Sequence, residues 1–226
     1  MDSKINTYLS LANIFRKNGF QLFLVGGTVR DYLLNIPLTD MDAVTDATPD
    51  EVRGFLDADF TFSKYGSISY KHDGVKFDIT TLRKEESYAD SRHPNEIIFV
   101  KDLSTDVVRR DFTINAMYLD INLTLIDYYH GRDDLRNKIL RMVGEPVLRL
   151  KEDPLRIIRA IRFSLDFDLT IEESLDKAIR DNIDLLNNLN PEKIKQDVKK
   201  IRCSDKEKIS KVFQDYNIKL VLDMLE

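Results

Sequence analysis

The chain has 226 residues, of which 42% are hydrophobic and 32% are charged, and its formal net charge is −5. This composition is typical of a globular protein with one large or two small domains, and the acidic balance argues mildly against a chain coated by nucleic acid. No apolar stretch approaches the length of a membrane span, and the single cysteine, Cys203, excludes a disulfide framework and is compatible with a reducing cytoplasm.

A glycine turn is the first segment that predicts chemistry. Residues 3–18 space their apolar side chains like a covering helix, and the apolar run at 22–25 predicts a buried strand. Gly26 and Gly27 end that strand, and a helical pattern follows them. Glycine lets a ligand approach the backbone, and a helix start presents free N–H groups, so the turn predicts a phosphate site. An ordinary turn is the simpler alternative.

Two carboxylates follow this turn. Asp40 and Asp42 are two residues apart, which places both on the same face of an extended strand. Such a pair repels itself unless a cation lies between its members, and hard oxygen ligands suit Mg²⁺. A solvated surface pair is the alternative. Together with the glycine turn, the pair indicates nucleotide chemistry.

Residues 24–45, LVGGTVRDYLLNIPLTDMDAVT, closely resemble a signature of the tRNA nucleotidyltransferase and bacterial poly(A) polymerase family. Further along, Thr48 and Glu51 form a capping box that predicts a helix start. Two alternating runs between residues 66 and 82 predict a hairpin, with Asp78 on the polar face of its second strand. A solvated sheet face would explain Asp78 equally well, but the segment FDITTLR resembles the family element that carries a third metal-site carboxylate.

The next stretch is expected to be a loop followed by a nucleotide-binding helix. Residues 83–96 are polar and aperiodic, resembling the flexible loop of family members that add the terminal adenosine, and 97–100 predicts a short strand. In VVRRDFTINAM, residues 107–117, a helix would place Asp111 and Asn115 on one face, while Arg110 could fork onto a triphosphate or ribose oxygen. Asp111 could hold Arg110, accept from a sugar hydroxyl, or simply cap the helix. This is the second segment that resembles the family. Residues 121–129 predict one further strand.

After Met142 the pattern is helical. Asp153, Arg156, Arg159 and Arg162 recur at every third position of EDPLRIIRAIRF, a polar stripe that could simply be solvated. This segment also resembles the family, and the resemblance implies that it reads the incoming base. A carboxylate such as Asp153 accepts from the exocyclic amine of cytosine or adenine, and Arg156 could donate to the neighbouring ring acceptor. Arg159 and Arg162 would then face phosphate or the RNA primer. The basic stretch at 191–211 predicts contact with an RNA backbone.

The resemblance covers about residues 5–205 and implies an α/β (α+β) head at 1–142, with a mixed sheet and flanking helices resembling the polymerase-β-type fold, followed by an all-α neck at 143–226. It implies template-independent addition of C and A nucleotides, from CTP and ATP, to the 3′ end of tRNA at its acceptor stem, with release of pyrophosphate. Asp40, Asp42 and Asp78 would hold Mg²⁺. The implied nucleotide-binding residues are Gly26, Gly27, Arg30, Arg110, Asp111, Asn115, Asp153, Arg156, Arg159 and Arg162.

Two other functions remain open. One is an enzyme that adds A or mixed tails to other RNAs, and the other is an inert RNA-binding relic of the fold, against which the intact Asp40, Asp42 and Asp78 argue. Bacterial members of the family continue into body and tail domains, so the resemblance implies either a minimal enzyme with looser RNA choice or a shortened piece. The sequence predicts no membrane association and no particular oligomeric state.

Overall fold

The computed structural model describes residues 3–88, 94–218 and 221, which form two compact units. The head unit contains the described residues up to Ser87, together with Pro94–Arg110 and Ile114–Gly131. The helical unit contains Tyr88, Asp111–Thr113 and the described residues from Arg132 onward. The domain border predicted after Met142 stays a prediction, and each unit is described below by itself.

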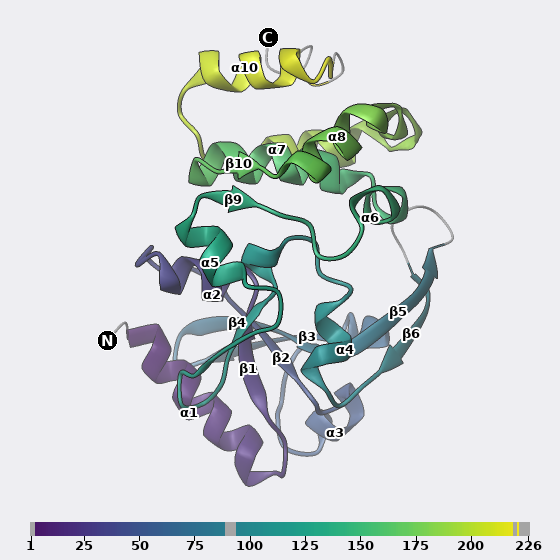
Figure 1. Ribbon diagram of the computed structural model, residues 1–226. Helices are drawn as coiled ribbons and strands as arrows, with labels where there is room; N and C mark the ends of the chain where they lie inside the picture. The colour runs from purple at the N-terminus through teal and green to yellow at the C-terminus, as the bar shows by residue number, and fades with distance from the viewer. Residues whose placement is uncertain (1–2, 89–93, 219–220, 222–226) are drawn as a thin grey trace. The chain divides into compact units, whose positions relative to one another are not determined.

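The head unit is built on a six-stranded sheet in the order β3-β4-β2-β1-β7-β8 (Figure 1). β2 and β4 are parallel and the other neighbours are antiparallel, so the sheet is mixed, as expected. Its strands are β1 (Leu22–Val25), β2 (Met41–Thr45), β3 (Ser67–His72), β4 (Val75–Thr81), β7 (Met117–Leu119) and β8 (Leu125–Asp127).

Helix α1 (Ser3–Lys17) belongs to the core of the head unit. Its apolar positions recur at helical spacing, and five of its side chains are at most 1% exposed: Ile5, Tyr8, Leu11, Ala12 and Phe15. The Tyr8 hydroxyl donates to the carbonyl oxygens of Leu22 at 2.9 Å and Leu119 at 3.1 Å, which ties the helix to β1 and β7. Helices α2 (Gly27–Leu33) and α3 (Pro49–Arg53) follow β1 and β2, and the capping box at Thr48 and Glu51 is confirmed.

The β3–β4 hairpin sets the register of the site. Asp73 and Gly74 at its turn have φ of 45° and 82°, as a tight two-residue turn requires. In β4 the apolar side chains Phe77 and Ile79 are fully buried, whereas Lys76 is exposed and Asp78 is half-buried. The alternation therefore places Asp78 on the polar face, as predicted.

The loop predicted at 83–96 was wrong for the residues that the structure describes. β5 (Arg83–Tyr88) and β6 (Pro94–Phe99) pair as a separate two-stranded sheet, and residues 89–93 lie outside the described residues. A two-stranded ribbon can be polar on both faces because it need not cover a core. The segment therefore lacked the alternation from which a strand is recognised.

The helix predicted across residues 107–117 was also wrong. Helix α4 (Leu103–Val107) ends before Arg110, a 3₁₀ turn spans Thr113–Asn115, and β7 follows it. The three residues of β7 are at most 1% exposed and pair with strands on both sides. Pairing within the sheet therefore decides the extended backbone conformation of this segment. Of the strand predicted at 121–129, only Leu125–Asp127 (β8) forms a strand. It follows a turn in which backbone N–H groups donate to Asp120.

The helical unit is organised around α7 (Leu155–Phe167), against which α9 (Pro191–Val198) and α10 (Lys206–Asp215) pack (Figure 1). A short parallel pair, β9 (Ile139–Leu140) with β10 (Thr170–Ile171), was not expected in this part of the chain. None of the described helices is long and apolar enough to cross a membrane. The remaining elements are α5 (Gly131–Arg136), α6 (Pro146–Glu152), α8 (Glu173–Asp181) and 3₁₀ turns at Ser63–Tyr65 and Ile183–Asn188.

Candidate functional site

The glycine turn lies against the start of β2. Gly26 has φ 65° and ψ −132°, a backbone conformation that residues other than glycine rarely adopt. A Cβ atom at Gly26 would lie 4.0 Å from Asp42 Oδ2, and one at Gly27 would lie 3.3 Å from Arg30 Nη2. Thr28 Oγ1 accepts from the Asp42 backbone N–H at 2.8 Å, which fixes the turn to the strand. The two predicted features, turn and carboxylate, are therefore adjacent.

The predicted carboxylates share one electrostatic environment. Asp42 lies directly opposite Asp78 on the parallel strand β4, and Asp40 comes just before β2. Surrounding protein partly desolvates Asp42 although its side chain reaches solvent, and this raises its pKa. The charges of Asp78 and, less strongly, Asp40 add to the rise, whereas Arg110 and Arg30 oppose it. Negative charge is thus concentrated around Asp42, with two guanidinium groups close enough to moderate it.

A lysine ammonium already lies among these carboxylates. Lys76 Nζ lies 2.9 Å from Asp78 Oδ2 and 3.9 Å from Asp40 Oδ2. Within the described ranges no three acidic, histidine or cysteine side chains are close enough to hold a metal ion as they stand. The donor set nevertheless fits a hard divalent cation, because it consists of carboxylate oxygens and already attracts a positive group. Sequence reasoning missed Lys76, which alternation places on the same face as Asp78.

Two predicted nucleotide-binding residues, 85 positions apart in the sequence, are hydrogen-bonded to each other. Arg30 Nη1 donates to Asn115 Oδ1 at 2.7 Å, and both residues are buried, at 5% and 7% exposure. Arg30 also donates to Asp31 Oδ1 from Nε at 2.9 Å and from Nη2 at 2.7 Å. The Arg30 guanidinium is therefore held in a fixed orientation next to Gly27.

Arg110 is anchored by an acid that sequence reasoning missed. Asp106 is fully buried and accepts from Arg110 Nη2 at 2.8 Å and from the Tyr118 hydroxyl at 2.9 Å. The backbone N–H of Arg83 and the Arg109 side chain also donate to it. Burial raises the pKa of Asp106, but the charges of Arg110 and Arg109 outweigh it and lower the pKa to about 2. The spacing of four residues between Asp106 and Arg110 is the sequence signal that could have revealed this pair.

Within the helical unit, Asp111 binds Arg159. Arg159 donates to Asp111 Oδ2 from Nε at 2.9 Å and from Nη2, and Asp111 Oδ1 accepts from the Phe112 backbone N–H at 2.7 Å. The predicted helix face shared by Asp111 and Asn115 does not exist, because Asp111 is followed by a 3₁₀ turn at Thr113–Asn115 and not by an α-helix. No local pattern in the sequence indicates that Asp111 has a partner 48 residues away.

The arginine stripe on α7 is not a solvated face. Arg156 is 6% exposed and donates from Nη1 to the Arg149 carbonyl at 2.6 Å and to Glu152 at 2.9 Å. Arg162 is 8% exposed, and its Nη1 lies 3.5 Å from Asp197 on α9. Asp153 Oδ1 accepts from the Leu155 backbone N–H at 3.1 Å. The predicted roles of these residues toward base, phosphate or RNA stay predictions.

Gly26 offers a test of the turn. Gly26→Ala should lower the free energy of unfolding by about 1–3 kcal/mol, because alanine is strained at this φ and ψ, and it should also impair the site beside Asp42. Gly19→Ala is the matched control, since Gly19 has φ 87° with open space around it and lies in the turn after α1. Thermal unfolding and activity of both variants decide the matter. Equal loss of activity in the two would refute a functional role for the Gly26 turn.

Comparison with known proteins bears on this site directly. Residues 22–141 match the family described as the poly A polymerase head domain. The CCA-adding enzyme of Staphylococcus saprophyticus is 42% identical over 187 residues, which are 82% of this chain and 47% of that protein. The crystal structure of Bacillus stearothermophilus CCA-adding enzyme in complex with CTP superposes with a TM-score of 0.81 at 32% identity, covering 89% of this chain and 49% of that one.

A third similar structure is a tRNA nucleotidyltransferase complexed with a primer tRNA and an incoming ATP analog, with a TM-score of 0.76, 29% identity, and coverage of 92% of this chain and 60% of that one. The chain spans about half the length of the curated relatives that it matches. The matched region contains the glycine turn, all three carboxylates and Arg110. The resemblance seen in the sequence is thus confirmed, and the chain belongs to the poly A polymerase head domain family, in which its relatives are CCA-adding enzymes.

Proposed function

We propose that the chain is a template-independent RNA nucleotidyltransferase that adds C and A nucleotides from CTP and ATP to the 3′ end of tRNA and releases pyrophosphate. The observation that carries this proposal is the position of Asp42 opposite Asp78, beside a glycine turn and under the influence of Arg30 and Arg110. The relatives named as CCA-adding enzymes, and their structures with CTP, an ATP analog and primer tRNA, support the choice of substrates.

Nucleotidyltransferases of this family generally use divalent metal ions. We propose that Asp40, Asp42 and Asp78 hold Mg²⁺, which would supply the positive charge that activates the primer 3′-hydroxyl and neutralises the triphosphate. The glycine turn lets the triphosphate approach the backbone closely. Arg30 and Arg110 donate to its oxygens, and both are held in place before the substrate arrives, by Asn115 and Asp31 and by Asp106 respectively.

Base choice is assigned to the helical unit. Without a nucleic-acid template, protein groups must contact the pairing edge of the incoming base. Asp153 would accept from the exocyclic amine that cytosine and adenine share, and Arg156, held by Glu152, would donate to the adjacent ring acceptor. Arg159, which is ion-paired with Asp111, would contact the nucleotide. Arg162 and the lysines of α9 would contact RNA phosphates. The proposed border between the catalytic and base-reading parts lies after Met142.

Asp153→Ala should relax base choice. The variant should incorporate UTP and GTP alongside CTP and ATP, because the discriminating acceptor is gone. The loss expected is about 1–3 kcal/mol of selectivity, or roughly 5- to 150-fold. The measurement is kcat/KM for each of the four nucleotides on the same primer tRNA.

Asp153→Asn is the control for this variant. Asparagine retains an oxygen acceptor that can still cap Leu155 N–H, so its overall activity and stability should stay closer to wild type than those of Asp153→Ala. Wild-type selectivity in the alanine variant would mean that the base is read by other residues.

The alternatives differ in RNA and nucleotide use. A tailing enzyme would extend unrelated RNAs as well as tRNA, and an inert relic would extend neither. The deciding experiment offers equimolar tRNA lacking its 3′ CCA and an unstructured RNA of equal length, with Mg²⁺ and one labelled nucleotide at a time. Preferential labelling of tRNA by CTP and then by ATP supports the proposal.

Because the relatives are bacterial tRNA-processing proteins, the proposed compartment is the cytoplasm.

A further inference from the structure

Lys76 occupies the space between two of the carboxylates to which a metal has been assigned. Its ammonium group lies 2.9 Å from Asp78 Oδ2 and 3.9 Å from Asp40 Oδ2, and its side chain is about half exposed. The Asp78 hydrogen bond raises the pKa of Lys76, and the charges of Asp78, Asp40 and Asp42 add to the rise. A lysine ammonium is positively charged at neutral pH, so this geometry places a positive group between Asp78 and Asp40.

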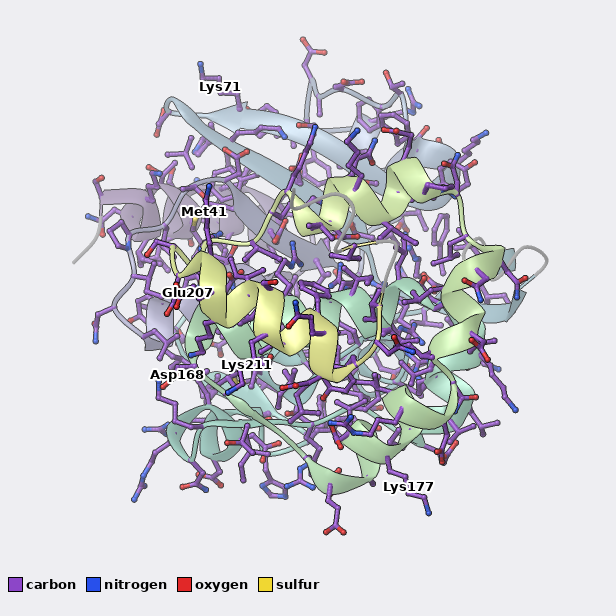
Figure 2. All side chains as sticks on the ribbon, turned by 90° about the horizontal axis from the view of Figure 1, so that it is seen from above. Met41, Lys71, Asp168, Lys177, Glu207 and Lys211 are labelled. Atoms are coloured by element: carbon purple, nitrogen blue, oxygen red, sulfur yellow. The ribbon has the colours of Figure 1, made fainter. Side chains whose placement is uncertain are left out.

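A second lysine lies opposite Lys76 on the neighbouring strand of the hairpin. Lys71 on β3 pairs with Lys76 in the hairpin register, and directly opposite residues have side chains on the same face of the sheet. Lys71 therefore offers a second ammonium group at the matching position of the hairpin, against which the role of Lys76 can be tested. Figure 2 shows Lys71 extending outward from the hairpin.

We propose that the Lys76 ammonium is a built-in counter-ion of Asp40 and Asp78 that a divalent cation must displace, and that Lys76 thereby sets the metal affinity of the site. This inference rests on the metal assignment of the proposed function. A cation entering between the carboxylates meets a positive charge at 2.9 Å from one of its ligands, so the ammonium must leave before the coordination shell can close. A pocket of about 640 Å³, lined by Lys76 itself with Lys71, Tyr70 and Asp40, is open beside it and can receive the displaced side chain.

The counter-ion also has a role when no metal is bound. Asp42 and Asp78 lie opposite each other on neighbouring strands, where like charges repel, and a positive group 2.9 Å from Asp78 offsets part of that repulsion. Removing Lys76 should therefore destabilise the metal-free protein slightly and increase the stabilisation gained on binding a metal. A lysine with a purely solvent-facing role would change neither quantity.

The test is direct titration of the whole chain with Mn²⁺, following free Mn²⁺ by electron paramagnetic resonance at low ionic strength. Lys76→Met should tighten Mn²⁺ binding about fivefold, the upper end of what one exposed ion pair contributes, and should increase the rise in Tm on adding Mn²⁺. Lys76→Arg should bind like wild type. Lys71→Met, which removes the same charge from the opposite position of the hairpin, should change the Kd by less than about twofold.

Two results would overturn the inference: an unchanged Mn²⁺ Kd in Lys76→Met, or equal tightening in Lys71→Met. Failure of the underlying metal assignment is distinguished by Asp42→Asn. If this variant binds Mn²⁺ as tightly as wild type, the ion is held elsewhere and the proposed function loses its metal site, whatever Lys76 does.

Discussion

Replacing Asp42 by Asn is expected to lower nucleotide addition by about 10³-fold or more, because one lost charged ligand removes roughly 4 kcal/mol of transition-state stabilisation. The same change should leave Tm unchanged or raise it. Burial and the charges of Asp78 and Asp40 raise the pKa of Asp42, so its ionised form is unfavourable in the folded protein and the neutral amide relieves that repulsion. The measurement pairs kcat for CTP addition with thermal unfolding.

Asp50→Asn is the matched control for Asp42→Asn. Asp50 is also a carboxylate of the head unit, but its side chain is 96% exposed. Its replacement should change neither activity nor Tm appreciably. An Asp42→Asn protein that keeps more than a tenth of wild-type turnover would contradict the assignment of Asp42.

Asp106→Asn should have the largest effect on stability, a loss of about 3 kcal/mol or more in the free energy of unfolding, because it removes the buried negative charge that both guanidinium groups contact. Asp106 is fully buried, forms ion pairs with Arg109 and Arg110, and accepts a hydrogen bond from the Tyr118 hydroxyl. The expected drop in Tm is on the order of 10 °C for a chain of this size. Urea unfolding of the variant measures the loss.

The helix that contains Asp106 provides its control. Asp102 caps α4 by accepting from Thr105 N–H at 2.8 Å, and its replacement by Asn, an equally good cap, should be nearly neutral. Comparable losses in Asp102→Asn and Asp106→Asn would show that the helix, rather than the buried charge network, is responsible.

The same carboxylate predicts how stability depends on pH. The folded pKa of Asp106 is about 2, below its ordinary value of 3.8. Its ionised form therefore contributes stability that is fully present above about pH 4, and this contribution of about 2 kcal/mol is lost as the pH falls through 3.8 toward 2. In Asp106→Asn the unfolding free energy should fall less steeply over this interval than in wild type.

The features that local sequence carries were predictable. The capping box at Thr48, the hairpin turn at Asp73 and Gly74, and the polar position of Asp78 each follow from a few neighbouring residues. The polar ribbon of β5 and β6 carries no such local signal, and β7 was assigned to a helix because its short apolar run fits either pattern.

Long-range ion pairing was the second feature that could not be predicted from the sequence. The sequence identified Arg110, Asp111 and Arg159 as charged candidates, but not that Asp106 holds Arg110 or that Asp111 binds Arg159. Lys76 was passed over for the same reason, since its importance depends on an adjacent strand bringing Asp40 within 3.9 Å. Such pairings are decided by the tertiary fold rather than by spacing along the chain.

The most direct test of the central claim starts from a tRNA transcript that lacks its 3′ CCA. The transcript is incubated with the protein, Mg²⁺, CTP and ATP, and the new 3′ ends are sequenced, with Asp42→Asn run in parallel. The account predicts that wild type adds two C residues followed by one A and then stops, that CTP alone gives only the C residues, and that Asp42→Asn adds nothing measurable. Unextended tRNA with the wild-type protein, or tails of A alone, would contradict it.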